Sequence, residues 1–292
     1  MSFSIITDTS ANLPTPLLRE HSIAAVPFHY YIKEREFACT DTEAFDSKSY
    51  YAAIREGTKV TTSLVSPAVY AEYFRVPLER GEDLLFVGMS SGISGSFGAA
   101  QLAAAQLREE FPQREIYLID SIGASLGEGF LALRAVELRA EGMSAAQAAA
   151  QLEPLRERMC QVFTVDDLMH LRSTGRLSNA AAVIATVLNI KPLLKGNENG
   201  QIVSFAKVRG RRRSIEAIAE NYDRLVENAA GQTVGIAHAD CLEDAEYLIS
   251  LLRRHNPPRD VMLVDYEPVT GSHVGPGALA LFFFGSDRFR GE

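Results

Sequence analysis

The first half of the chain alternates between two patterns of hydrophobic and polar positions. Short apolar runs predict buried strands at Phe3–Thr7, Ala24–Tyr31, Leu84–Met89 and Ile116–Asp120. Amphipathic segments between them predict helices at Ala44–Glu56, Pro67–Glu79, Gly98–Phe111 and Leu126–Glu141. Strands that alternate with helices are typical of a parallel sheet covered on both faces. We therefore predict an α/β parallel-sheet domain over residues 1–157.

The pattern changes after an alanine-rich helix within Gly142–Arg158. Asp166 or Asp167 is placed to cap a helix that starts at Leu168, and a strongly apolar helix is predicted over Asn179–Ile190. Further strands are predicted at Gln161–Val165, Gln201–Val208, Thr233–Ala239 and Asp260–Glu267, and further helices at Arg213–Glu227 and Glu243–His255. This order predicts a second domain, of the α+β class, over residues 158–292.

Composition narrows the class of protein. The 292 residues are 47% hydrophobic, which is enough for a sizeable core, and the net charge of −8 argues against general nucleic-acid binding. The longest apolar runs, such as Ala278–Phe284, are too short to cross a bilayer. Three widely spaced cysteines do not suggest a disulfide framework, and no histidines have the spacing of metal ligands. We expect a cytoplasmic protein without a metal or cofactor.

The most informative segment follows the predicted strand Leu84–Met89. It is a turn rich in serine and glycine that leads into a helix, and it holds Ser90, Ser91, Ser94 and Ser96 but no lysine or arginine. Ligands of open α/β sheets bind beyond the carboxyl ends of the strands, where helix N-termini also attract anions. Neutral donors there suit a carboxylate. The alternative is a solvated strand–helix turn.

Three other segments combine small or glycine residues with polar side chains. Thr62 precedes Ser66 and Pro67. Ser66 followed by proline predicts a helix that Ser66 caps and Pro67 opens. Capping alone explains Ser66 but not Thr62. His273 lies in a predicted glycine-rich turn over residues 271–277, where a pKa near neutrality suits hydrogen bonding to an anion or proton transfer. Arg176 lies in a tight link between helices, where it either reaches an anion or ties the helices together.

Lys207, Arg209 and Arg211 belong to the densest basic run of this acidic chain. Such a run is either a solvated charge cluster or a docking site for an acidic partner or a phosphate. Ser94, Asp120 and His273 follow the chain order of α/β-hydrolase triads, but Ser96 stands where the nucleophile elbow needs glycine. A serine hydrolase acting on a lipid or ester through Ser94 and His273, with Asp120 or Asp8, is therefore the alternative function.

Taken together, these segments resemble the DegV family, the fatty-acid-binding subunits of bacterial fatty acid kinase. The resemblance covers nearly the whole chain. It is carried by seven motifs in order, which span residues 7–13, 60–63, 90–97, 120–121, 175–178, 190–192 and 271–277. Ser96-Phe97 replaces the more usual threonine–tyrosine, and Ser272 stands where threonine is common.

The resemblance implies a two-domain fold with a long-chain fatty acid in a ligand tunnel between the domains. It implies that Thr62 and Ser94 hold the carboxylate, with His273 and Arg176 close by. Such proteins are carriers rather than enzymes: they present the acid to a separate kinase subunit, which makes the acyl phosphate used in phospholipid synthesis. Contact with a membrane surface is expected to be transient at most. Asn179–Leu188 and Ala278–Phe284 are candidates for the tunnel wall, with ordinary core as the alternative. A third hypothesis makes His273 a phosphoacceptor.

Overall fold

The computed structural model describes residues 3–178, 189–286 and 288–291. The chain divides into two compact units, Met1–Phe45 with Thr61–Arg156 and Asp46–Val60 with Glu157–Glu292. The predicted division into two domains at residue 157 stays a prediction.

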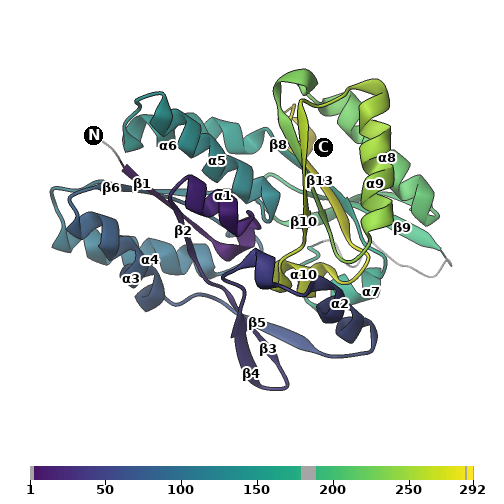
Figure 1. The fold of residues 1–292 in the computed structure, drawn as a ribbon, viewed down its shortest axis with the longest axis horizontal. Coiled ribbons are helices and arrows are strands. Elements are labelled where there is room, and N and C mark those ends of the chain that lie inside the picture. The colour runs from purple at the N-terminus through teal and green to yellow at the C-terminus, as the bar shows by residue number, and fades with distance from the viewer. Residues whose placement is uncertain (1–2, 179–188, 287, 292) are drawn as a thin grey trace. The chain divides into compact units, whose positions relative to one another are not determined.

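The first unit is built on a parallel sheet with strand order β2-β1-β6-β7 (Figure 1). The strands are β1 (Phe3–Asp8), β2 (Ile23–Val26), β6 (Asp83–Gly88) and β7 (Ile116–Asp120). All three pairings are parallel. Four successive residues of β6, Leu84 to Val87, are 0% exposed, so this strand is covered on both faces. The predicted parallel-sheet architecture is confirmed.

Helices cover both faces of this sheet: α3 and α4 lie on one side and α5 on the other (Figure 1). The helices of the unit are α1 (Thr15–Glu20), α3 (Pro67–Glu79), α4 (Ser96–Glu110), α5 (Leu126–Ala140) and α6 (Ala145–Glu157), with short 3-10 turns η1 (Thr9–Ala11) and η2 (Thr42–Ala44). Sequence predicts α3 with its observed bounds, because Ser66 caps it and Pro67 opens it.

The strand predicted over Ala24–Tyr31 is wrong as a single element. It is divided between β2, in the parallel sheet, and β3 (His29–Ile32), in a separate sheet of order β4-β3-β5. The break falls at Pro27, which has no N–H to donate to a sheet. The other two strands are β4 (Arg35–Ala38) and β5 (Val60–Ser63). Both are short and mostly polar, so the hydrophobic pattern did not reveal them.

The second unit has a mixed sheet with strand order β10-β9-β8-β13-β11-β12. β11 and β12 pair in parallel and the other pairings are antiparallel, and this largely antiparallel sheet confirms the predicted α+β class. The strands are β8 (Met159–Thr164), β9 (Ile190–Gly196), β10 (Ile202–Arg209), β11 (Thr233–His238), β12 (Asp260–Asp265) and β13 (Leu279–Phe284). The helix predicted over Asn179–Ile190 lies outside the described residues, except that Ile190 opens β9.

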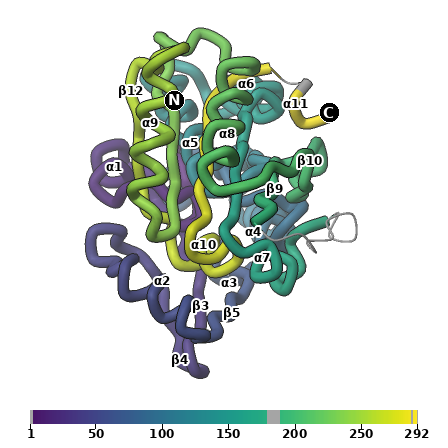
Figure 2. Tube along the Cα trace, turned by 90° about the vertical axis from the view of Figure 1, so that its right-hand side faces the viewer, coloured from purple at the N-terminus to yellow at the C-terminus, as the bar shows by residue number. Residues whose placement is uncertain are grey.

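Two amphipathic helices, α8 (Arg211–Leu225) and α9 (Leu242–His255), lie side by side against this sheet (Figures 1 and 2). The other elements of the unit are α2 (Ser47–Arg55), α7 (Leu168–Ser173), α10 (Pro268–Val274), α11 (Arg288–Gly291) and the turn η4 (Ala229–Gly231). Asp167 caps α7 by accepting the Met169 N–H at 2.8 Å. It was one of the two residues predicted as the cap of this helix. Among the described residues, no helix is long and apolar enough to cross a membrane.

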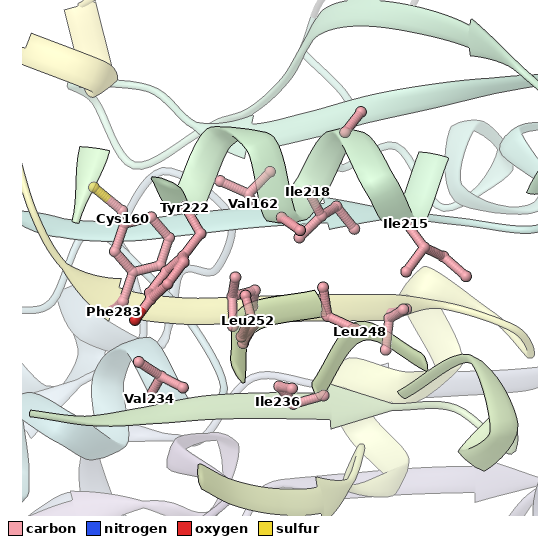
Figure 3. Close-up of a cluster of buried hydrophobic side chains, with 14 of the residues drawn as sticks. Cys160, Val162, Ile215, Ile218, Tyr222, Val234, Ile236, Leu248, Leu252 and Phe283 are labelled. Carbon is pink, nitrogen blue, oxygen red and sulfur yellow. The ribbon is translucent and has the colours of Figure 1, made fainter. Parts of the chain in front are cut away.

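The core of the second unit lies between the sheet and these two helices (Figure 3). Tyr222 of α8 packs edge-on against Phe283 of β13, with ring centroids 5.0 Å apart and planes at 80°. Leu279, Leu281 and Phe283 all belong to this core. Since alternate residues of a strand face opposite sides, these three side chains are core rather than the wall of a ligand tunnel.

Removal of the Ser66 hydroxyl tests whether this residue stabilises α3 as its N-terminal cap. The Ser66 hydroxyl accepts the Val69 N–H at 3.4 Å, and its side chain is exposed. We expect Ser66→Ala to lower the free energy of unfolding by about 1 kcal/mol. Chemical denaturation of the variant and the wild type checks this value, and an unchanged free energy of unfolding would show that Ser66 does not stabilise α3 as its cap.

Candidate functional site

The serine-rich turn lies at the carboxyl edge of the parallel sheet, between β6 and α4. Ser90 organises it. Its N–H donates to the Gly123 carbonyl at 2.8 Å, and its carbonyl accepts the N–H groups of Ile93 at 3.2 Å and Ser94 at 3.1 Å. Its hydroxyl accepts the Gly92 N–H at 3.0 Å. Ser90 is 0% exposed, so it is a buried support of the turn rather than a ligand contact.

Ser94 and Ser96 form a hydrogen-bonded pair at the start of α4. Their hydroxyl oxygens are 3.1 Å apart, and the Ser96 N–H donates to Ser94 Oγ at 3.2 Å. Ser96 is 0% exposed, whereas Ser94 is only partly buried. Of the two hydroxyls, Ser94 is therefore the one that a ligand can reach from solvent.

Ser96 also connects this turn to the segment that follows Thr62. Its hydroxyl oxygen accepts the Val65 N–H at 3.2 Å. Thr62 lies on β5, three residues before Val65, and is partly buried. The first unit thus ties together the two segments from which sequence predicted Thr62 and Ser94 as carboxylate donors.

A pair of buried carboxyl groups lies at the same sheet edge. Asp8, at the end of β1, is 1% exposed, and Glu128, in the first turn of α5, is 0% exposed. Asp8 accepts the N–H groups of Ser10 at 2.9 Å and Met89 at 3.2 Å. Glu128 accepts the Thr7 hydroxyl at 2.9 Å. Asp8 therefore joins β1 to the residue that precedes the serine-rich turn.

The Ser10 hydroxyl shows that this pair holds an extra proton. Its oxygen is 2.5 Å from a carboxyl oxygen of Asp8 and 2.6 Å from one of Glu128. One hydroxyl proton serves only one of these contacts, so a carboxyl proton has to supply the other. Burial raises the pKa of Asp8 to about 6, and burial together with the nearby Asp8 charge raises the pKa of Glu128 well above its ordinary value of 4.5. Both shifts favour a proton held within the pair.

Asp120, at the end of β7, stabilises the neighbouring loops. Its carboxylate accepts the N–H groups of Ser91 at 3.3 Å and Ile122 at 3.0 Å. Asp8 is likewise engaged by backbone N–H groups and a serine hydroxyl. Capping accounts for both carboxylates that the hydrolase alternative would use. These contacts give no separate support to a catalytic triad.

His273 lies in helix α10 of the second unit, and this corrects the predicted glycine-rich turn. Residues 271–274 are helical, and the chain turns only after them, where Gly275 has a φ of 81°. Glu267 caps the helix by accepting the N–H groups of Val269 at 2.6 Å and Thr270 at 2.5 Å. The helix therefore begins here because Glu267 caps it and Pro268 occupies its first turn.

The environment of His273 also differs from the predicted one. Burial, together with the smaller effects of the nearby Arg176 and His170, lowers the pKa of His273 to about 4. His273 is therefore neutral at physiological pH, where an ordinary histidine is partly charged. The Coulombic effect of Arg176 shows that the second unit brings these two predicted site residues into one neighbourhood.

Helix α10 is held in place from two sides within the second unit. His170 of α7, which lies next to α10 (Figure 2), has its Nε2 atom 2.7 Å from the Ser272 carbonyl oxygen, so Nε2 carries the donated proton. On the other side, the hydroxyl of Tyr51 in α2 donates to the Tyr266 carbonyl at 2.6 Å. These contacts fix the helix that carries His273.

The basic run divides into exposed and engaged residues. Lys207 and Arg209 are exposed and, two residues apart on β10, face the same side of that strand. Arg211 is different: its guanidinium lies 2.8 Å from the Asp244 carboxylate on α9 and is partly buried. Arg211 therefore serves to join α8 to α9. The described residues contain no cluster of three His, Cys, Asp or Glu side chains suited to a metal ion.

Comparison with known proteins decides the family. A family model described as "Uncharacterised protein, DegV family" matches residues 2–286. The chain belongs to the DegV family. A DegV domain-containing protein of Clostridium perfringens is 33% identical over 98% of both chains. Protein DegV of Bacillus subtilis is 30% identical over 96% of this chain and 98% of its own.

Solved structures of DegV-family proteins share the fold. A fatty-acid-binding DegV-family protein of Thermus thermophilus is 28% identical, with a TM-score of 0.86 over 98% of this chain and 100% of its own. DegV of Bacillus subtilis, described as a fatty acid binding protein, is 29% identical, with a TM-score of 0.82 over 98% and 100% of the two chains. The two-domain α/β architecture expected of the family is thereby established.

Sequence reasoning missed several residues that shape this DegV-family site. The sequence motifs did not single out Glu128 or His170. A glutamate among the small apolar residues Gly127, Gly129 and Phe130 was the available signal for Glu128, because charged residues in such surroundings are often paired. No local signal marked His170, whose partner lies 102 residues away.

Proposed function

We propose that this DegV-family protein binds a long-chain fatty acid and presents its carboxylate to a separate fatty acid kinase subunit. Thr62 and Ser94 donate hydrogen bonds to the carboxylate. His273 adds a neutral donor, and Arg176 contributes positive charge. The protein acts as a carrier, and the phosphoryl transfer that makes the acyl phosphate takes place on the partner. A cytoplasmic location belongs to the same proposal.

The observation that carries the proposal is the partly buried Ser94, whose hydroxyl is joined through Ser96 to the segment of Thr62. Uncharged donors at the carboxyl edge of a parallel sheet suit an anionic headgroup. Family relatives above a quarter identity, including one from Streptococcus agalactiae at 27%, are described as fatty acid binding. A carboxylate on a hydrocarbon chain is therefore the ligand class we assign.

Elementary energetics support a weakly charged headgroup site. Burial of a sixteen-carbon acid removes about fourteen methylenes from water, worth on the order of 11 kcal/mol before ordering costs. The tail therefore supplies the affinity. The polar end needs only to satisfy a desolvated carboxylate, which would otherwise cost several kcal/mol. Serine and threonine hydroxyls meet that need.

The lowered pKa of His273 fits this role. A neutral imidazole donates one hydrogen bond without forming an ion pair. A carboxylate held by neutral donors keeps the electron density that it needs to attack a phosphoryl group. Above a pH of about 4, the His273 contribution is therefore expected to be constant.

For the kinase partner, we propose that Lys207 and Arg209 form the contact surface. Both are exposed, and they alternate with partly buried residues on β10. Arg211 was predicted with them, but its ion pair with Asp244 gives it a structural role as well. Charge reversal at Lys207 and Arg209 should reduce acyl-phosphate formation with a cognate kinase and leave fatty-acid affinity unchanged.

Lipid extraction and mass spectrometry of the purified protein, followed by titration with a fatty acid, test the proposal. We expect a bound long-chain fatty acid. Ser94→Ala and Thr62→Ala should each weaken binding by about tenfold or more, since hydrogen bonds to charged groups are the stronger class. Ser91→Ala is the matched control, because Ser91 lies exposed in the same turn and should leave affinity unchanged.

Two outcomes would overturn this assignment. One is wild-type affinity in both Ser94→Ala and Thr62→Ala. The other is covalent labelling of Ser94 by a fluorophosphonate probe, which would favour the serine hydrolase. A phosphorylated His273 in protein purified from cells would instead support the phosphoacceptor hypothesis.

A further inference from the structure

Helix α2 joins the second unit from a distant part of the chain. The second unit includes Asp46–Val60, whereas the segments before and after it belong to the first unit. Arg55, at the end of α2, donates to the Asp240 carbonyl at 3.0 Å and forms an ion pair with the Asp240 carboxylate. Because this pair and two tyrosines hold α2, contacts within the second unit determine its position.

The two tyrosines of α2 hold the start of α10, and we call their two hydrogen bonds the tyrosine clamp. The Tyr50 hydroxyl donates to the Pro268 carbonyl at 2.7 Å. The Tyr51 hydroxyl donates to the Tyr266 carbonyl at 2.6 Å. These carbonyls lie on either side of Glu267, the residue that caps α10. Since both tyrosines are buried, water does not compete for the two bonds, and the clamp fixes the start of the helix.

The chain leaves α2 through a turn of defined geometry that leads into β5. Gly57, with a φ of 94°, donates its N–H to the Ile54 carbonyl at 3.0 Å. The Thr58 N–H donates to the Ala53 carbonyl at 2.9 Å. These two bonds form a Schellman motif, which ends a helix in a fixed direction. Thr62 follows four residues after Thr58, so the orientation of α2 sets the direction in which the chain enters β5.

We propose that α2 is a coupling helix, through which ligand binding at Thr62 and the order of α10 influence each other. This inference rests on the proposed function and deepens it. A ligand that orders β5 orders the exit of α2, and the tyrosine clamp passes that order to α10. Coupling of this kind is reciprocal, so a loosened clamp must also weaken ligand binding. Tyr50 and Tyr51 are therefore positioning residues, because they act through α10 and not through contact with the ligand.

Amide hydrogen exchange and titration with hexadecanoic acid test this coupling in two variants. Tyr50→Phe/Tyr51→Phe keeps both rings and removes both hydroxyls. It should speed amide exchange in α10 about tenfold and weaken binding about tenfold. Insertion of two glycines after Thr58 loosens the link to β5 and leaves the clamp intact. It should also weaken binding about tenfold, while exchange in α10 of the ligand-free protein stays at the wild-type rate.

Matched controls separate coupling from a general loss of stability. Tyr222 is also 0% exposed in the second unit, and its hydroxyl donates to the Asn256 carbonyl at 2.9 Å. Tyr222→Phe should therefore lower the free energy of unfolding and leave fatty-acid affinity unchanged. Two glycines inserted after Gly142, in the turn between α5 and α6, should likewise leave affinity unchanged.

Wild-type affinity in the insertion variant would overturn the inference, because α2 would then act without its link to Thr62. Wild-type affinity in Tyr50→Phe/Tyr51→Phe would overturn it as well. Where that variant does not fold, the insertion alone decides. If Ser94→Ala and Thr62→Ala weaken binding and the two α2 variants do not, the inference alone fails. If Ser94→Ala and Thr62→Ala have no effect either, the proposed function fails.

Discussion

Glu128→Gln is expected to flatten the fall in protein stability as the pH rises above the ordinary glutamate value of 4.5. Glutamine keeps an oxygen to accept from Thr7 and an N–H to donate toward Ser10, so it mimics the protonated glutamate. It carries no charge at any pH. The free energy of unfolding, measured by chemical denaturation across this range, should therefore keep declining above pH 6 in the wild type, whereas the variant should retain only the loss from Asp8, which ends near pH 6.

The sign follows from the raised pKa values of the pair. A carboxyl group whose pKa is higher in the folded protein binds a proton more tightly there, so stability is greatest below the unfolded pKa and falls as pH rises through the folded value. For Asp8 this window runs from the ordinary value of 3.8 to about 6, and for Glu128 it extends further upward from 4.5. The loss for Asp8 alone is on the order of 3 kcal/mol.

A matched control separates burial from charge. Glu137 lies on the same helix, α5, but its side chain is 61% exposed beside Arg134. Glu137→Gln should change stability by less than about 1 kcal/mol and leave its pH dependence intact. Equal pH profiles for the wild type and Glu128→Gln would show that the folded protein does not hold a proton on Glu128.

Local sequence signals determined much of the fold correctly. The Ser66-Pro67 pair gave the start of α3, and Asp167 gave the start of α7, because caps act within one turn of the chain. The apolar runs of β1, β6 and β7 were long enough to distinguish buried strands from loops. Short polar strands such as β5 were not predicted from sequence, because their neighbouring strands rather than their own side chains stabilise them.

The candidate site was harder to predict because its contacts cross long stretches of chain. The sequence motifs singled out Ser94 and His273, but not the groups that fix them. Glu128 meets Ser10 across 118 residues, and His170 meets Ser272 across 102. The lowered pKa of His273 could not be predicted from sequence, because burial and the nearby Arg176 and His170 cause it. Residue types could be predicted from sequence, whereas their protonation states required the tertiary structure.

Gly271→Ala is expected to destabilise the protein even though alanine favours helices. A Cβ at position 271 of α10 would lie 1.9 Å from the Tyr51 hydroxyl oxygen, which is held by its bond to the Tyr266 carbonyl. Tyr51 is 0% exposed and has no free space into which to move. Such overpacking costs about 1–3 kcal/mol, more than the gain of about 1 kcal/mol in helix propensity. Denaturation of the purified variant measures the balance.

Two further variants test the cause. Tyr51→Phe removes the clashing oxygen, but the ring carbon behind it would still be 2.9 Å from the new Cβ. The double variant should therefore recover part of the loss, so that the two effects are not additive. Gly98→Ala in α4, where a Cβ meets nothing within 4 Å, should instead stabilise the protein. Because α10 carries His273, Gly271→Ala should also weaken fatty-acid binding. Full additivity would mean that Tyr51 is not what excludes a side chain at position 271.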